Sequence, residues 1–205
     1  MIEKIKVVCD KLISDFSDIS DERKHLLGKL SDYIQDKINH HQEINLVYIC
    51  THNSRRSHFG QIWSKVAAEY YGIKNITTFS GGTEATAFNM NAINAISKVG
   101  FEVVCINESS NSLYHVFYDL HSEPIICFSK VYSADENPKN NFAAIMTCGD
   151  AEENCPFIPG VELKIATTYQ DPKVFDNTPL QDEMYNKRSL QIAQECLYVF
   201  SKIAK

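Results

Sequence analysis

The chain reads Ile49-Cys50-Thr51-His52-Asn53-Ser54-Arg55-Arg56-Ser57 directly after the apolar run 44–48. This placement predicts a buried strand that ends near the cysteine and a helix that begins near the serine. At such a junction several backbone N–H groups converge on one point, with the helix N-terminus behind them. The stretch therefore predicts an anion-binding loop with a cysteine at its floor.

Three side chains of this loop suit the attack of sulfur on a tetrahedral oxyanion. Cys50 supplies a thiolate, and the planar fork of Arg56 holds two oxygens of the anion. Ser57 is placed to donate a hydrogen bond that stabilises the thiolate. The alternative is a buried structural cysteine beside a surface arginine pair, because Cys-x5-Arg alone also arises by chance. The rest of the loop is expected to surround the anion with Arg56 and Ser57, namely Thr51, His52, Asn53, Ser54 and Arg55.

Length and composition restrict the class of protein. With 205 residues and 44% hydrophobic residues, the chain fits one large domain or one domain with additions. A net charge of -6 argues against general nucleic-acid binding. No basic-then-apolar leader opens the chain and no apolar run approaches membrane-spanning length, so we expect no membrane association and a cytoplasmic location.

The seven cysteines fall into two groups. An odd number without a signal peptide does not fit a secreted disulfide scaffold. Four lie in apolar periodic segments and are expected to be small core residues, namely Cys9, Cys105, Cys127 and Cys196. The other three lie at the ends of expected elements or in loops and need a chemical explanation, since cytosolic cysteines that matter are usually catalytic, redox-active or metal-bound. These are Cys50, Cys148 and Cys155.

Hydrophobic periodicity predicts an α/β domain with an extension before it. Two amphipathic helices, 2–16 and about 20–38, form an N-terminal extension over residues 1–42. Their apolar faces need a partner, either the body of the domain or a second chain, so a dimer through these helices is one option. The domain itself, residues 43–205, alternates strands and helices, which predicts a parallel sheet. Its strands are 45–49, 76–80, 143–147 and 163–168, and its helices are 57–71, 89–99 and 180–203.

The stretch 107–141 breaks this alternation. Residues 101–106 are expected to be extended, and 113–118 and 124–132 are both strand-like and joined by a turn-like segment. The simplest interpretation is an antiparallel hairpin inserted into the domain.

Four chemically useful residues fall at or just after the ends of predicted parallel strands: Cys50, Ser80, Cys148 and Asp171. Ligands of open parallel sheets gather at this edge. Asp171, held by the following Pro172, suits a general acid that protonates a leaving oxygen and then activates water. The alternative is an ordinary surface turn, which Asp-Pro also favours.

Cys148 and Cys155 lie seven residues apart in a segment, 148–160, that is expected to be a turn-rich loop. A zinc site is one explanation, but the usual Cys-x2-4-Cys spacing and a second pair of ligands are missing. Two inert buried cysteines are another. A redox pair fits best, because a disulfide needs Cα atoms within about 7 Å, which a flexible loop allows and a regular helix does not.

Two stretches resemble a known family. VYICTHNSRRSHFGQIW, residues 47–63, resembles the phosphate loop and first helix of the low-molecular-weight tyrosine phosphatase superfamily. MTCGDAEENCPFIP, residues 146–159, followed by Asp171-Pro172, resembles more closely its thioredoxin-coupled arsenate reductase branch. The resemblance covers about 44–106 and 142–203. It implies a three-layer α/β sandwich around a central four-stranded parallel sheet, the phosphotyrosine phosphatase I-like fold.

The resemblance also implies a reaction. Cys50 attacks arsenate while Arg56 and the loop amides hold the oxyanion. Cys148 then attacks the Cys50 sulfur and arsenite leaves. Exchange with Cys155 gives a Cys148–Cys155 disulfide, which thioredoxin or another thiol reduces. In this scheme Asn53 braces the loop, Ser80 lies near it, and no metal or tightly bound cofactor takes part.

The chain departs from the family pattern at several positions. His52 stands where the family usually has glycine, which changes the rim of the loop. Gln61 replaces an acidic residue that some reductases associate with a bound potassium ion, which makes that ion doubtful here. Lys173, Val174 and Phe175 follow Asp171-Pro172, where phosphatases often have tyrosines that grip phosphotyrosine.

Three classes of function remain. The first is an arsenate reductase with a Cys50–Cys148–Cys155 relay. The second is a low-molecular-weight protein tyrosine phosphatase, which hydrolyses phosphate monoesters through a phosphocysteine and needs no redox pair. An aromatic wall from the insert, built of Tyr114, Phe117 or Tyr118, would favour it. The third is a non-enzymatic binding domain, which the intact nucleophile, arginine and acid argue against.

Overall fold

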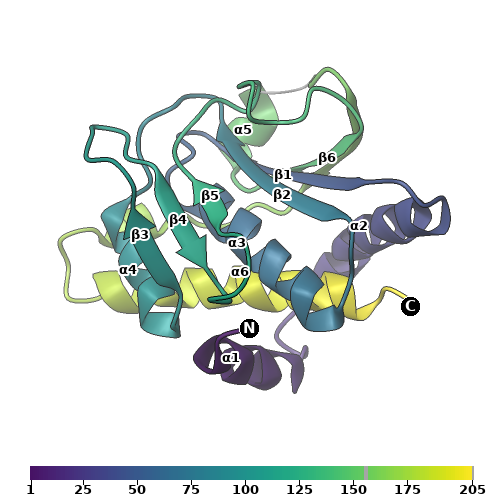
Figure 1. Cartoon of the computed structure of the whole chain (residues 1–205), viewed down its shortest axis with the longest axis horizontal. Coiled ribbons are helices and arrows are strands. Elements are labelled where there is room, and N and C mark those ends of the chain that lie inside the picture. Colours follow the sequence, from purple (N-terminus) through teal and green to yellow (C-terminus); the bar gives the residue numbers. More distant parts are fainter. Residues whose placement is uncertain (155–156, 205) are drawn as a thin grey trace.

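A parallel four-stranded sheet forms the centre of the computed structural model, which describes residues 1–154 and 157–204 (Figure 1). The strand order is β2-β1-β6-β7, and β1 pairs in parallel with both β2 and β6. This confirms the predicted sheet. One boundary was wrong, because the strand expected over 76–80 continues through Gly81 to Gly82. The strands are β1 (Ile44–Cys50), β2 (Ile76–Gly82), β6 (Phe142–Met146) and β7 (Val161–Ala166).

Strand alternation divides the interior into two cores. Leu46 and Tyr48 of β1 point to the larger core, which they share with helices α3 (Arg56–Tyr71) and α6 (Gln181–Ser201). Val47 and Ile49 point to the opposite face, where α5 (Gly149–Asn154) covers the sheet. Helices therefore lie on both faces, and the three-layer architecture is confirmed (Figure 1).

Local capping fixes the ends of the helices around the sheet. α3 ends at Gly72, whose φ of 70° lies in the left-handed region that glycine tolerates. α4 (Met90–Val99) begins after Asn89, whose side chain accepts hydrogen bonds from the first amides of the helix. Both boundaries follow the sequence prediction.

The N-terminal extension consists of α1 (Glu3–Ile13) and α2 (Asp21–Asn39), and Ser20 caps α2 by accepting a hydrogen bond from the amide of Arg23. α1 lies beneath α6 in Figure 1. The apolar side chains of both helices are buried in the core of the domain body, so this body is the partner that their faces need. The buried residues are Ile5, Cys9, Leu27, Leu30 and Ile34.

The insert forms a separate antiparallel sheet of order β3-β4-β5. The predicted hairpin is present as β4 (Tyr114–Phe117) and β5 (Ile125–Cys127), but β3 (Glu102–Cys105) adds a third strand. The second strand of the hairpin is also shorter than predicted. Cys105 was wrongly expected in the core. It is exposed, because it is the last residue of the outer strand β3.

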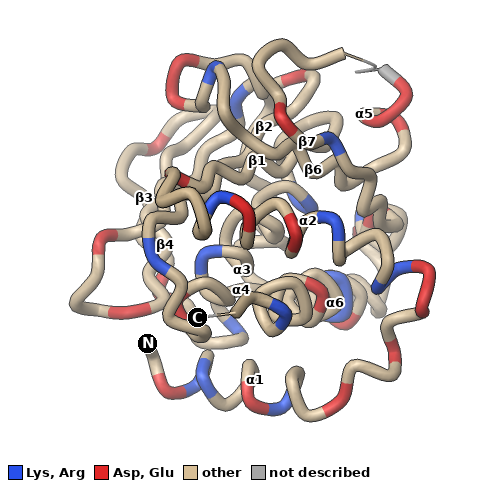
Figure 2. The backbone as a smooth tube through the Cα atoms, turned by 90° about the vertical axis from the view of Figure 1, so that its right-hand side faces the viewer, with Lys and Arg blue, Asp and Glu red and all other residues tan. Residues whose placement is uncertain are grey.

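Charge is spread over the molecule. Lys and Arg positions are interspersed with Asp and Glu positions in Figure 2. Within the described ranges, no helix has the length and apolar character needed to cross a membrane.

Candidate active site

The Cys50 sulfur lies where β1 ends and α3 begins. Cys50 is 3% exposed, and its Sγ is 3.1 Å from the Ser57 hydroxyl in the first turn of α3. Asn53 donates to the same hydroxyl through Nδ2 at 2.9 Å. Because the Ser57 oxygen already accepts this bond, its own hydrogen is available to the sulfur. The loop therefore holds a hydroxyl donor and a helix N-terminus beside the thiol.

Asn53 and Gly82 fix the path of the loop. Asn53 adopts a φ of 43°, a conformation that Asn tolerates better than most residues, and its Oδ1 accepts from the amide of Lys130 at 2.8 Å. A Cβ on Gly82 would lie 2.6 Å from the Thr51 carbonyl and 2.7 Å from the Asn53 nitrogen. Only glycine allows β2 to approach the loop this closely.

Arg56 and Asp171 meet across the site. Arg56 is 8% exposed, and its Nη2 donates to Asp171 Oδ2 at 2.5 Å. Its Nη1 donates to the carbonyl of Tyr169 at 2.8 Å. Asp171 also accepts from the amide of Lys173 and so begins the short 3-10 helix η1 (Pro172–Phe175). The structure thus joins two residues that the sequence placed only at the same edge of the sheet.

Arg55 contacts α6 and lies near Asp171, whose Oδ1 is 4.0 Å from its Nε. Its Nε donates to the Tyr185 hydroxyl at 2.7 Å, and Tyr185 donates in turn to Asp176 at 2.7 Å. Arg188, one turn further along α6, is close enough for the Arg56 charge to add to burial in lowering the pKa of its guanidinium. Asp176, Tyr185 and Arg188 were not predicted from the sequence. Their spacing on α6 places Tyr185 and Arg188 on one helix face, which is the only local sign of their association.

Cys148 lies beside the loop. It is 1% exposed, and its Sγ is 3.4 Å from the Thr51 hydroxyl. It packs in the same buried cluster as Cys50. Cys155 lies outside the described residues.

The segment that joins these two cysteines was expected to be a loop, but residues 149–154 form helix α5. Asp150 and Glu152 in its first turn favour a helix N-terminus, which explains the difference.

The other predicted residues take supporting positions. His52 lies on the rim, with Nε2 3.7 Å from a Glu84 oxygen. The Ser54 carbonyl accepts from the amide of Asn89 at 3.0 Å and so links the loop to α4. The Ser80 hydroxyl is 3.2 Å from Nδ1 of His58 on α3, so Ser80 supports the helix behind the loop.

His58 is a buried neutral histidine behind the site. Burial, and then the nearby Lys130 charge, lower its pKa to about 3. Its ring stacks on Phe88 at 4.1 Å, and Phe88 also contacts Tyr114 edge-on. Tyr118 is buried, and its carbonyl accepts from the amide of Ile2. Tyr114 and Tyr118 of the insert therefore lie in different surroundings: Tyr114 contacts Phe88, whereas Tyr118 contacts the N-terminal segment.

Within the described ranges, no group of three or more His, Cys, Asp or Glu side chains is arranged to hold a metal ion. The chemical groups that converge are a thiol, an arginine and a carboxylate, with a second thiol at the edge of the loop. Such a set can bind a tetrahedral oxyanion and transfer it to sulfur.

Comparison with known proteins agrees with this chemistry, although no family model matches the chain. The chain is 29% identical over 129 residues to arsenate reductase 2 of Staphylococcus haemolyticus, covering 62% of this chain and 77% of the relative. It is 29% identical over 128 residues to the arsenate reductase of Bacillus subtilis, covering 62% and 73%.

Solved structures show the same fold at lower identity. A low-molecular-weight phosphotyrosine phosphatase from Vibrio cholerae aligns with a TM-score of 0.54 at 12% identity, covering 77% of this chain and 95% of that one. An arsenate reductase in the phosphate-binding state aligns with a TM-score of 0.52 at 17% identity, covering 78% and 99%.

The fold and the loop define a cysteine-dependent enzyme of the low-molecular-weight phosphatase type. With the arsenate reductase relatives, they support a similarity of the chain to the low-molecular-weight tyrosine phosphatase superfamily and its arsenate reductase branch.

Proposed function

We propose that the chain is an arsenate reductase that works through Cys50, Cys148 and Cys155. One observation carries the proposal. A second buried thiol, Cys148, lies against Thr51 of the loop that begins at Cys50. Phosphate ester hydrolysis has no use for this thiol, whereas reduction needs a second sulfur that can reach the first. The arsenate reductase relatives support the same assignment.

In the first step the Cys50 thiolate attacks arsenic(V), and an oxygen leaves as water after protonation. Arg56 and the loop amides hold the remaining oxygens. Because Arg56 Nη2 is bound to Asp171, an incoming oxyanion competes with this carboxylate for the guanidinium. Asp171, released from Arg56, is then placed to protonate the leaving oxygen.

In the second step the Cys148 thiolate attacks the Cys50 sulfur. The sulfur–arsenic bond breaks, and its electron pair stays on arsenic, which leaves as arsenite. A Cys50–Cys148 disulfide holds the two oxidised sulfurs. Cys155 then attacks Cys148, which frees the Cys50 thiolate and forms the Cys148–Cys155 disulfide that thioredoxin or another dithiol reduces.

Helix α5 bears on the exchange in which Cys155 attacks Cys148. Residues seven apart in a regular helix are separated by about 10 Å along its axis, whereas a disulfide needs Cα atoms within about 7 Å. A regular helix over the whole of 148–155 would therefore prevent this disulfide, so we expect the helical segment 149–154 to rearrange when the two cysteines pair. The scheme requires no metal or bound cofactor.

Gln61 has no role in this scheme. Its amide donates to the carbonyls of Thr78 and Ile126 and so joins two strands. A potassium ion therefore forms no part of the proposal.

A second activity, hydrolysis of phosphate esters, follows from the Arg56–Asp171 contact. Phosphate has the same shape and charge as arsenate, and the phosphocysteine pathway needs only Cys50, Arg56 and Asp171. The rim after Asp171 carries Lys173 and the exposed Val174, and offers no tyrosine of the kind that grips phosphotyrosine. This favours small phosphate esters for the side activity.

Three proteins test the proposal: wild type, Cys148→Ser and Cys155→Ser. Each is assayed for thioredoxin-linked arsenate reduction and for hydrolysis of an aryl phosphate. Reduction should collapse in both variants while hydrolysis continues, because hydrolysis uses only the Cys50 sulfur. Unchanged arsenate turnover in either variant would contradict the relay.

A further inference from the structure

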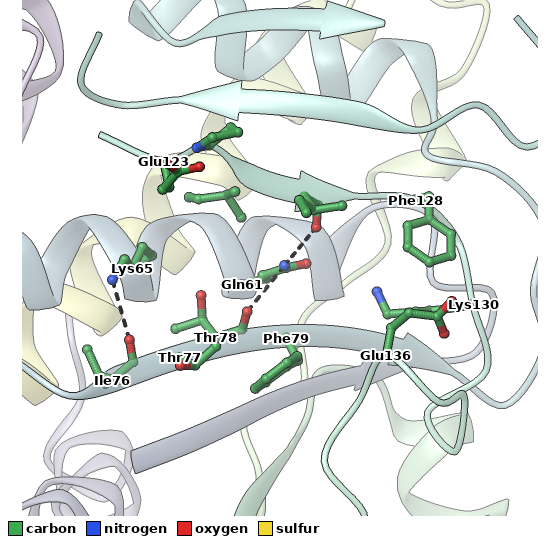
Figure 3. Close-up of a pocket in the computed structure, with 13 residues that line it drawn as sticks. Gln61, Lys65, Ile76, Thr77, Thr78, Phe79, Glu123, Phe128, Lys130 and Glu136 are labelled. Atoms are coloured by element: carbon green, nitrogen blue, oxygen red, sulfur yellow. Dashed lines mark hydrogen bonds between the residues drawn. The ribbon is translucent and has the colours of Figure 1, made fainter. Parts of the chain in front are cut away.

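A cleft of about 340 Å³ opens between β2 and β5, away from the Cys50 sulfur (Figure 3). Both strands are the outer strands of their sheets. Gln61 of α3 donates to Thr78 O at 3.3 Å and to Ile126 O at 3.1 Å, and so joins the two strands. The volume falls at the lower end of the roughly 300–1,000 Å³ typical of small-molecule sites.

The wall of the cleft is mainly apolar. Its apolar lining residues are Ile76, Phe79, Pro124, Ile125, Ile126 and Phe128. Ile126 is 50% exposed, so part of this apolar surface is in contact with solvent. An apolar ligand body would remove that surface from water.

Lys130 gives the cleft its chemical specificity. The residue is 6% exposed, and its ammonium points into the space between the strands (Figure 3). Nζ lies 4.5 Å from the Phe128 ring centroid. Among the described residues, it has no hydrogen-bond acceptor and no carboxylate at ion-pair distance. Its own amide is fixed to Asn53 of the active-site loop at 2.8 Å, which anchors the backbone of this residue.

The groups around this ammonium do not neutralise it. Burial lowers the pKa of Lys130, which shows the cost of its desolvation. Glu136 also lines the cleft, and its charge acts to raise the pKa of Lys130, but its side chain is exposed to water. Burial raises the pKa of the Cys127 thiol to about 12, so this neighbour is neutral. A buried cation of this kind is complementary to an anion.

The open edge of β2 argues against an added peptide strand. Its carbonyls already accept side-chain hydrogen bonds: Ile76 O from Lys65, Thr78 O from Gln61, and Ser80 O from Asn137. A peptide would have to displace these donors to pair with β2. A small anion needs only the Lys130 ammonium, which has no hydrogen-bond partner within the described part of the chain.

We propose that this cleft binds a small amphipathic carboxylate, with the apolar body between β2 and β5 and the carboxylate on Lys130. The site is separate from the reaction at Cys50, and its test does not depend on arsenate reduction. The Asn53–Lys130 hydrogen bond connects the ligand to the active-site loop.

Calorimetric titration with decanoate and with decanol tests the proposal. Saturating inorganic phosphate occupies the Cys50 loop, so decanoate cannot report binding there. Decanoate should bind wild type, and Lys130→Met should weaken it about tenfold or more while decanol binding changes little. Lys65→Met is the matched control, because Lys65 Nζ already donates to a carbonyl; decanoate affinity should be unchanged.

A second variant covers the case in which Lys130→Met does not fold. Ile126→Asp places a carboxylate on a half-exposed wall without disturbing the core, and it should abolish binding of both probes. Three results would overturn the proposal: no decanoate binding to wild type, equal affinity in Lys130→Met, or displacement of decanoate by an extended peptide that protects the β2 amides from exchange.

Discussion

Arg23 of α2 lies 2.9 Å from Glu195 of α6, measured from Nε to Oε2, and both side chains are largely buried. Glu195 also accepts from the Tyr169 hydroxyl at 2.7 Å, and Arg23 Nη2 donates to Thr167 O at 2.9 Å. The carbonyl of Tyr169 in turn accepts from Arg56. The N-terminal extension is thus connected by hydrogen bonds to the arginine of the active site.

Replacing Arg23 tests whether the extension supports the site. Arg23→Met leaves Glu195 buried without its cation, so we expect a loss on the order of 3 kcal/mol in the free energy of unfolding. Arsenate turnover should also fall, since the Tyr169 carbonyl positions Arg56. Urea denaturation and steady-state kinetics measure the two effects. The double variant Arg23→Met/Glu195→Gln should recover part of the stability, and no recovery would show that the charge pair is not responsible.

Buried His58 predicts a loss of stability in acid. Its pKa is about 3 in the folded state against about 6.5 when unfolded, so the unfolded chain binds the proton more readily. The full stability is present above pH 6.5 and declines as the pH falls towards 3. Between pH 7 and pH 5 this histidine alone should cost about 2 kcal/mol of unfolding free energy. Urea denaturation at both pH values measures it. In His58→Asn the corresponding part of the decline should disappear, and an unchanged decline would exclude His58 as its source.

Gly82 tests the close approach of β2 to the loop. In Gly82→Ala the new Cβ meets the backbone of Thr51 and Asn53, so the loop must shift. Phosphate affinity, measured by calorimetry, should fall about tenfold or more. Gly28→Ala is the control, because a Cβ there meets nothing within 4 Å inside α2. It should raise stability by up to about 1 kcal/mol and leave phosphate binding intact. Equal phosphate affinity in Gly82→Ala and wild type would refute this account of the loop.

Asp171→Ala separates acid catalysis from binding. Without the acid, hydrolysis of an aryl phosphate should slow by about 10²- to 10⁴-fold in its bond-cleavage step. Phosphate itself should bind at least as tightly, because the competitor for Arg56 is gone. Pre-steady-state kinetics and calorimetry give the two values. An unaltered cleavage rate would remove Asp171 from the mechanism.

Local signals in the sequence were sufficient for much of the fold. Ser20, Gly72 and Asn89 act on backbone groups within a few residues, so their effects could be predicted from neighbours alone. The loop after β1 was recognised for the same reason, since strand, cysteine and helix follow one another directly.

Contacts between distant residues could not be predicted in this way. Arg55 and Tyr185 are 130 positions apart, and nothing near either residue indicates the other. Arg56 and Asp171 are separated by 115 positions and were predicted together only because both follow parallel strands. The pairing of β3 with β4 was not predicted, because the sequence of β3 does not show which strand edge it meets. The helical state of 149–154 was missed because turn-forming residues and first-turn acids occur together there.

The most direct test of the relay is a single turnover of the Cys155→Ser variant with arsenate in the absence of reductant, followed by peptide mapping with mass spectrometry. This variant can form the first disulfide but cannot pass it on. The relay predicts one Cys50–Cys148 disulfide for each arsenite released. Release of arsenite while Cys148 remains a free thiol would contradict it.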